Sequence, residues 1–146
     1  MTIRPPKPED TNALVELGVE FAEKSKPIHR MSVEPEKIRE LIFRAINDPQ
    51  VVGLVAENGT EVVGFIVGVI APSYFSNDLA FQELAFYMRK GTGGVRLLTA
   101  LEVEVAKRGV TKIYVGSKPK FCDLGKVYKH RGYQLVEEHY LKTTGV

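Results

Sequence analysis

The chain has 146 residues, of which 44% are hydrophobic and 26% are charged, and its formal net charge is +2. These values are typical of one globular domain over residues 1–146, with a hydrophobic core of its own, and they exclude a chain that is disordered throughout. So small a net charge does not call for a nucleic-acid partner, and we do not expect one.

Cysteine content and hydropathy bear on the compartment. The single cysteine, Cys122, cannot form an internal disulfide, and the first residues carry no apolar leader. No apolar run reaches the roughly 18 residues that cross a bilayer. We therefore expect a cytoplasmic protein without membrane contact, in which Cys122 is a small buried residue and not a nucleophile.

A short edge strand and two amphipathic helices are predicted in the first third of the chain. The strand covers residues 2–4. Asp10 then has the position of a helix N-cap, and this first helix is expected to end at Pro27. A start signal at residues 32–36 opens the second helix, which ends before Pro49. The apolar positions of the two helices are Ala13, Leu14, Leu17, Phe21 and Ala22, then Ile38, Leu41, Ile42 and Ala45.

From residue 51 the pattern changes to that of β-strands. Residues 51–56 and 61–71 are rich in β-branched side chains, and Asn58-Gly59 between them is a strong hairpin turn signal. A loop follows at residues 73–78, and residues 80–88 form a third strand. These segments predict a hairpin of two antiparallel strands, followed by a loop and a third strand.

The last part of the chain alternates between helix and strand. A glycine-dense turn at 89–94 opens a helix that ends at Gly109, and a strand follows at 112–115. A short helix is predicted at 121–130 and a closing strand or strand pair at 133–142. The order β-α-α-β-β-β-α-β-α-β predicts an α/β (α+β) fold, a mixed sheet with helices on both faces, in which the helical crossover joins two parallel strands.

The strand–turn–helix around residues 83–108 is the strongest chemical signal. The first amides of a helix have no partner in the helix, glycines let a ligand approach the backbone, and the helix dipole favours an anion. Arg89, Lys90 and Arg96 add positive charge. The segment therefore suits a pyrophosphate, although a tight turn with a solvated basic rim gives the same pattern. Its glycine spacing matches neither the NTPase loop nor the dinucleotide fingerprint.

Two segments resemble the GCN5-related N-acetyltransferase (GNAT) superfamily. Arg89-Lys90-Gly91-Thr92-Gly93-Gly94 is similar to the family's Arg/Gln-x-x-Gly-x-Gly/Ala turn, with Thr92 in place of the first motif glycine. Tyr128-Lys129-His130-Arg131-Gly132-Tyr133 is similar to the family's Tyr-x-x-x-Gly-Phe stretch. The resemblance implies a GNAT-like fold and an enzyme that transfers the acetyl group of acetyl-CoA to an amine.

The resemblance also implies where acetyl-CoA, the cosubstrate, would bind. Amides of the turn and of the helix start would hold the pyrophosphate, and backbone groups at the end of the preceding strand would pair with pantetheine like an added strand. The cofactor-binding residues expected on this basis are Phe86, Tyr87, Met88, Arg89, Gly91, Thr92, Gly93, Gly94, Val95 and Arg96.

Two residues are expected to carry the chemistry if transfer is direct, within a ternary complex. The family role of the Tyr128 position is a general acid that protonates the departing thiolate. Glu83 resembles the strand glutamate that acts as base in histone-type members. Packing of Tyr128 against the sheet and a solvated or ion-paired Glu83 are the structural alternatives, and Glu57 is a weaker second candidate for the base.

Several features leave alternatives open. His29, His130 and His139 lack metal-ligand spacing, so no metal is expected. Basic residues from 118 to 131 form either a solvated face or a site for the 3′-phosphate of coenzyme A or an acidic partner. Tyr74 and Phe75 either roof an acceptor pocket or, as we favour, pack on the core. Thr92 and Phe121 depart from the family pattern, which keeps a non-catalytic coenzyme A- or partner-binding module as the alternative function. The acceptor and a homodimer stay open.

Overall fold

The computed structural model describes residues 1–89 and 93–145. A single 3₁₀ turn at Pro8–Asp10 precedes the first helix. In chain order the other elements of the described residues are β1 (Thr2–Arg4), α1 (Thr11–His29), α2 (Pro35–Asn47), β2 (Val51–Asn58), β3 (Glu61–Pro72), β4 (Leu79–Met88), α3 (Gly94–Lys107), β5 (Val110–Tyr114) and α4 (Gly125–His130).

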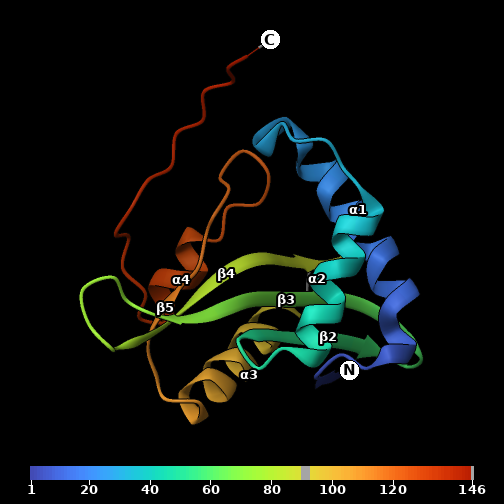
Figure 1. Ribbon diagram of the computed structural model, residues 1–146, viewed down its shortest axis with the longest axis horizontal. Coiled ribbons are helices and arrows are strands. Elements are labelled where there is room, and N and C mark those ends of the chain that lie inside the picture. Colours follow the sequence, from blue (N-terminus) through green and yellow to red (C-terminus); the bar gives the residue numbers. More distant parts are fainter. Residues whose placement is uncertain (90–92, 146) are drawn as a thin grey trace.

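Over the described residues one sheet forms, with the strand order β1-β2-β3-β4-β5 (Figure 1). Its first three pairings are antiparallel, and β4 pairs in parallel with β5. The hairpin between β2 and β3 turns at Gly59, which has the positive φ of 65° that glycine tolerates. The mixed α/β fold and the parallel crossover predicted from the sequence are confirmed.

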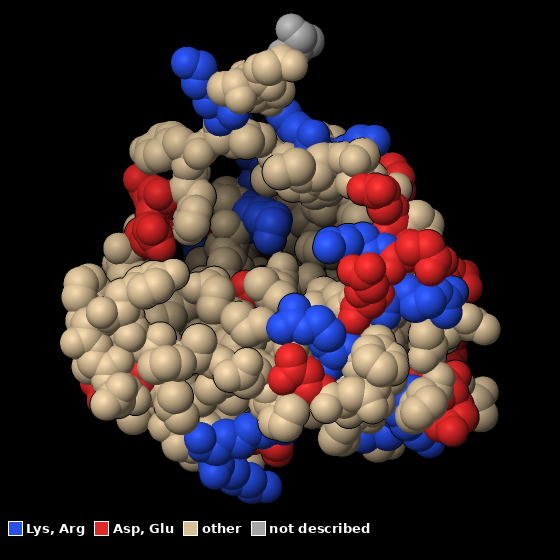
Figure 2. Space-filling view, in the orientation of Figure 1, with Lys and Arg blue, Asp and Glu red and all other residues tan. Residues whose placement is uncertain are grey.

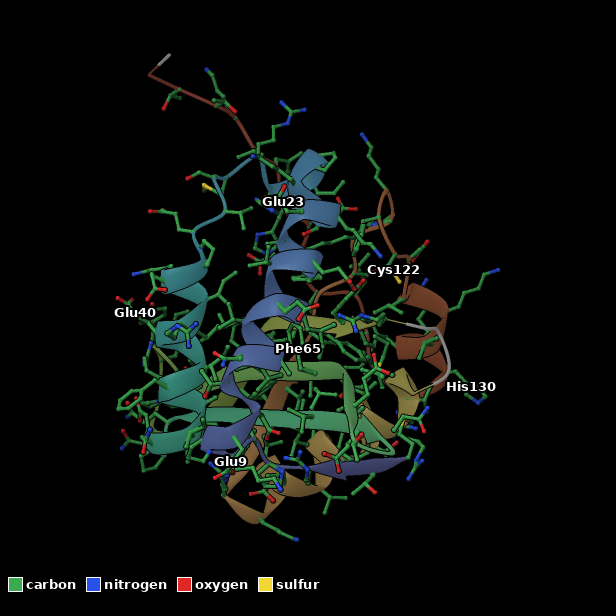
Figure 3. All side chains as sticks on the ribbon, turned by 90° about the vertical axis from the view of Figure 1, so that its right-hand side faces the viewer. Glu9, Glu23, Glu40, Phe65, Cys122 and His130 are labelled. Carbon is green, nitrogen blue, oxygen red and sulfur yellow. The ribbon has the colours of Figure 1, made fainter. Side chains whose placement is uncertain are left out.

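Helices cover both faces of this sheet. Alternating side chains of β2 separate two hydrophobic clusters: Leu54 packs with α3 and with Tyr128 of α4, whereas Val55 packs with α1 and α2. Figure 3 shows α1 and α2 side by side across one face, with Phe65 of β3 beneath α1. The period-2 pattern of the central strands therefore places the core on both sides of the sheet.

A β-bulge in β4 positions the site described below. Gly68 of β3 lies opposite Glu83, and Val67 lies opposite Ala85, so Leu84 is the extra residue. A Cβ on Gly68 would lie 2.3 Å from the backbone oxygen of Gln82, so this close approach requires glycine. A bulge bends its strand. Consistent with that, β4 pairs with β5 only from Leu79 to Gln82.

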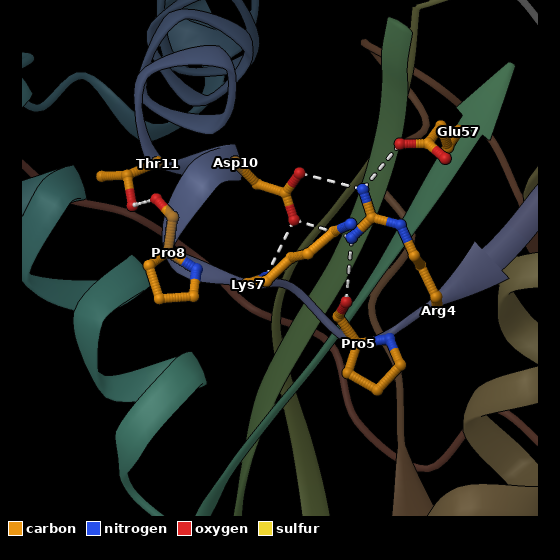
Figure 4. A network of polar contacts seen from close by, with 7 residues as sticks. All are labelled: Arg4, Pro5, Lys7, Pro8, Asp10, Thr11 and Glu57. Carbon is orange, nitrogen blue, oxygen red and sulfur yellow. Dashed lines mark hydrogen bonds and ion pairs between the residues drawn. The ribbon is translucent and has the colours of Figure 1, made fainter. Parts of the chain in front are cut away.

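The start of the chain is held by a polar cluster that the sequence did not predict (Figure 4). Arg4 donates to both carboxylate oxygens of Asp10, at 2.7 and 2.9 Å, and to Glu57 at 2.7 Å. The amide of Lys7 donates to Asp10 at 2.8 Å. The side chain of Asp10 therefore holds β1 to the start of α1. The sequence had suggested that this side chain caps α1, and it does not.

Two helix boundaries differ from the predictions. Helix α1 continues through Pro27 to His29 and ends at Arg30, which has a left-handed φ of 56°. Helix α4 begins only at Gly125, because residues 118–122 form a turn closed by a bridge between Lys118 and Cys122. Cys122 is exposed in this turn, so the prediction that it is buried was wrong.

The predicted last strand is also absent, since residues 133–145 contain neither helix nor strand. The described part of β5 has a strand partner only on its β4 side. A strand pattern needs a second strand to supply its hydrogen bonds, and the local sequence does not determine which strand that is. No helix in residues 1–89 and 93–145 is long and apolar enough to cross a membrane.

Candidate functional site

The site lies where β4 and β5 part. After Gln82, residues 83–88 of β4 remain paired with β3, but in the described chain no strand pairs with their other side. Every second peptide group of this half of β4 therefore faces an opening. Figure 2 shows a hollow between α1 and the loop after β5, above β4 in the view of Figure 1, with basic side chains on its wall.

Glu83 and Tyr128 meet at this opening through one residue, Gly116. The amide of Gly116 donates to the Glu83 carboxylate at 3.1 Å, and the Tyr128 hydroxyl donates to the carbonyl oxygen of Gly116 at 3.0 Å. Both side chains are buried, Glu83 being 8% and Tyr128 6% exposed. The structure thus brings together the two residues predicted to carry the chemistry, and among the residues that the structure describes Glu83 forms no salt bridge.

Burial sets the acidity of both groups. It raises the pKa of the Glu83 carboxyl above its usual value, and the Gly116 amide and the charge of Lys118 offset this only in part. The pKa of the Tyr128 phenol is also raised, first by burial and then by the charge of Glu83. A carboxylate with a raised pKa accepts protons closer to neutral pH than a solvated glutamate does.

The start of α3 adjoins the end of β4. A Cβ on Gly94 would contact the Phe86 ring at 3.5 Å, and one on Gly93 would lie 2.5 Å from the side chain of Met88. The first backbone bond into the helix runs from the Leu97 amide to the Gly93 oxygen at 3.1 Å. The amides of the first turn of α3 therefore have no partner inside the helix. They belong to Gly94, Val95 and Arg96.

Some of the predicted cofactor residues have other contacts or lie outside the described residues. Gly91 and Thr92 belong to the latter group. The Arg89 amide donates to the Val63 oxygen at 2.8 Å, and its guanidinium pairs with Glu20 at 3.3 Å and Glu61 at 3.0 Å. Its charge is therefore engaged toward α1 and the β2–β3 turn, so a role in binding pyrophosphate stays a prediction.

Tyr87 points to the face of the sheet covered by α1. Its hydroxyl donates to Glu20 at 2.7 Å and accepts from Lys24 at 3.1 Å. Burial and the Glu20 contact raise the pKa of the Tyr87 phenol. Phe21 packs against the ring at a centroid distance of 5.4 Å. The side chain of Tyr87 therefore lies on the α1 face of the sheet and is engaged there.

The weaker candidates lie elsewhere. Glu57 is bound by Arg4, which lowers the pKa of its carboxyl, so it is poorly suited to act as a base. Tyr74 and Phe75 are fully exposed in the loop before β4, at the strand end opposite the site. Our preference for packing on the core was wrong for both. Among the described residues no group of histidine, cysteine and carboxylate side chains could hold a metal ion.

Sequence reasoning missed Gly116 and the opening itself. Neither residue type nor spacing marks a backbone amide that faces a carboxylate 33 residues earlier. The bulge had a usable signal, because Gly64 and Gly68 interrupt the pattern of β3. Glycine inside a strand is typical of a bulge or of a close approach by another backbone.

The comparisons with known proteins agree on the fold. No protein-family model and no curated protein matches the chain. Many solved structures match the chain, and the following three are among those that match almost throughout. A probable acetyltransferase has a TM-score of 0.77 at 18% identity, with 100% of this chain and 98% of that one covered. Ribosomal-protein-alanine N-acetyltransferase from Brucella melitensis has a TM-score of 0.75 at 17% identity, with 99% of this chain and 100% of that one covered. A predicted acetyltransferase with acetyl-CoA from Clostridium acetobutylicum has a TM-score of 0.75 at 17% identity, with 98% of this chain and 95% of that one covered.

These likenesses confirm the GNAT-like fold that the sequence predicted, a mixed five-stranded sheet flanked by helices over the described residues. All three similar structures are described as acetyltransferases. At such low identity a shared fold does not transfer a substrate, so function has to be argued from the site.

Proposed function

We propose that this protein is an acetyltransferase that moves the acetyl group of acetyl-CoA to a primary amine. The observation that carries the proposal is the opening beside residues 83–88, which is bordered by a buried carboxylate, a buried phenol and the start of a helix. These are a base, a proton donor and an anion site, the groups that this reaction requires.

Acetyl-CoA fits the opening in two respects. Unpaired peptide groups near Phe86 and Met88 are suited to the amides of pantetheine, as in strand addition. The amides of Gly94, Val95 and Arg96, together with the helix dipole, are suited to the pyrophosphate. When bound, the cosubstrate supplies an acyl thioester whose carbonyl the amides near Met88 would polarise.

Glu83 is assigned the role of base. An amine must lose a proton to attack, and Glu83 would accept it, directly or through a water molecule. The new C–N bond then forms as the C–S bond breaks, and the electron pair leaves with sulfur. The raised pKa of the Glu83 carboxyl favours this acceptance because it brings the base closer to the working pH.

Tyr128 is assigned to the departing sulfur. Its raised pKa keeps the phenol protonated at neutral pH, so it has a proton to donate. The same shift makes it a weaker acid than a solvated tyrosine. We therefore expect Tyr128 to stabilise the thiolate mainly by a hydrogen bond, before any full transfer of the proton. For this the hydroxyl would turn from the Gly116 oxygen toward the sulfur.

The acceptor belongs to the broad class of amines: lysine side chains, protein N-termini, polyamines, amino acids and aminoglycosides fit the same chemistry. A cytoplasmic location is part of this proposal and rests on the lone cysteine.

The proposal is tested by titration calorimetry with acetyl-CoA, coenzyme A and dephospho-coenzyme A, followed by thiol-release assays over the amine classes. Val95→Asp places a carboxylate in the first turn of α3, where it suits the helix dipole but repels pyrophosphate. We expect coenzyme A affinity to fall at least about tenfold, roughly 1.4 kcal/mol, without loss of thermal stability.

The matched control is Val103→Asp, because Val103 is an equally exposed valine farther along the same helix. This variant should bind like the unmodified protein. Absence of binding at about 1 mM coenzyme A by the unmodified protein would refute the function. Equal affinities of the two variants would refute the position of the pyrophosphate.

A further inference from the structure

The outer edge of β5 has no strand partner. Within residues 1–89 and 93–145, β5 lies last in the sheet and pairs only with β4. Tyr114 at its end is exposed. Such an edge presents a row of unpaired amides and carbonyls that another strand can complete.

Residues 134–142, here called the C-terminal segment, have the composition of a strand but pair with none in the described chain. The residue before them is fixed: the Tyr133 amide donates to the Tyr128 oxygen at 3.0 Å, and its hydroxyl donates to Glu102 at 2.8 Å. Beyond Tyr133 the chain leads away from the sheet in Figure 1. Its large apolar side chains are exposed, namely Leu135, Val136, Tyr140 and Leu141.

Further exposed aromatics lie on the same side of the molecule. The loop that carries Tyr74 and Phe75 comes directly before β4, and Leu79 at the start of β4 pairs with Val110 at the start of β5. This loop and the start of the C-terminal segment are both on the β5 side in Figure 1. So much apolar surface on one side marks an interaction site.

The charges of the two surfaces are complementary. The C-terminal segment carries Glu137 and Glu138, whose described contacts are with the neighbouring His139 and Tyr140 in the same segment. Lys112 on β5 and Lys120 in the loop after it are exposed. An acidic strand placed along a basic edge gains this attraction.

We propose that the C-terminal segment of one copy pairs as a strand with β5 of a second copy, and reciprocally, in a twofold dimer. Nine extended residues span up to about 30 Å, which is enough to reach across an interface. The exchange provides strand partners for the β5 edge and for the segment, and a twofold axis closes the assembly at two copies. The exposed apolar side chains on this side would then be covered.

Light scattering after size-exclusion chromatography tests this at about 10–100 μM protein, a range in which weak dimers form. We expect a dimer for the unmodified chain. A chain that ends after Tyr133 and the variant Val136→Pro should both be monomers that are folded by circular dichroism, because the first lacks the segment and proline removes a strand donor from the second. Thr144→Pro, beyond the segment, is the matched control and should remain a dimer.

Two results would overturn the exchange: a monomeric unmodified chain, or a dimer that survives loss of the segment. In a different dimer, each segment would fold back on the β5 of its own chain. NMR on mixed dimers of differently labelled chains distinguishes this arrangement from the exchange. Contacts between residues 134–142 and 110–114 should be intermolecular. Contacts only within one chain would contradict the proposal.

Discussion

Asp10 and Glu83 are almost equally inaccessible to solvent, 7% and 8% exposed, yet the pKa values of their carboxyls are shifted in opposite directions. Arg4 lowers the pKa of the Asp10 carboxyl by two hydrogen bonds. Burial raises the pKa of the Glu83 carboxyl, whose hydrogen-bond partner among the described residues is the Gly116 amide. Burial alone therefore does not decide the role of a carboxylate. Asp10, with Arg4 as its partner, stabilises the fold, and we propose that Glu83 acts in the reaction.

Removing the cation should have the largest effect. Arg4→Met leaves the Asp10 carboxylate buried without its cation, although the Lys7 amide still donates to it, and we expect the free energy of unfolding to fall by about 3 kcal/mol. Urea unfolding of the variant measures this. Lys37→Met breaks an exposed pair with Glu40 and is the control, with an expected change close to zero. Equal losses in the two variants would mean that the Arg4 cluster does not stabilise the fold.

Removing the charge of the unpaired carboxylate should affect turnover instead. Glu83→Gln keeps the shape and loses the base, so we expect turnover to fall about 100-fold, roughly 2.7 kcal/mol, with an undiminished melting temperature. The thiol-release assay measures the rate, and Glu36→Gln, on the exposed side of α2, should be fully active. Full turnover by the Glu83 variant would leave the carboxylate without its proposed role.

A comparison of Tyr128 with Tyr133 separates a loss of stability from a loss of turnover, and both losses should be smaller than those above. Tyr128→Phe loses the bond to Gly116 and Tyr133→Phe the bond to Glu102, so both should lose about 1 kcal/mol of stability. Only Tyr128→Phe should also lower turnover, by about tenfold, because only Tyr128 adjoins the opening. Similar rates in the two variants would indicate that Tyr128 has a packing role alone.

The smallest expected effect is on the pH dependence of stability. The pKa of Asp10 is lowered on folding, so its contribution is present above the unfolded value of 3.8 and is lost as pH falls. The pKa of Glu83 is raised, so its contribution is present below the unfolded value of 4.5 and is lost as pH rises through the folded pKa. Melting curves from pH 4 to 8 should show a steeper alkaline decline for the unmodified protein than for Glu83→Gln; parallel curves would contradict this.

The sequence predicted the features that repeat locally. The alternation of β2 and β3 and the helical spacing in α1, α2 and α3 determine which side chains are buried, so the layers and the strand–turn–helix could be predicted. The sequence did not predict features that depend on contacts between distant residues. Arg4 meets Glu57 across 53 positions, and Tyr128 of α4 meets Gly116, in the loop after β5, across 12 positions. The prediction of a closing strand at residues 133–142 was wrong for a related reason. The residue pattern of a strand does not determine which sheet edge that strand pairs with.

The pH profile of kcat/KM, taken with the best acceptor from the thiol-release screen, tests the contrast between the two carboxylates most directly. We predict an acid limb with an apparent pKa above the usual glutamate value, which disappears in Glu83→Gln. An acid limb of the same position and height in that variant would contradict the assignment of Glu83 as the base.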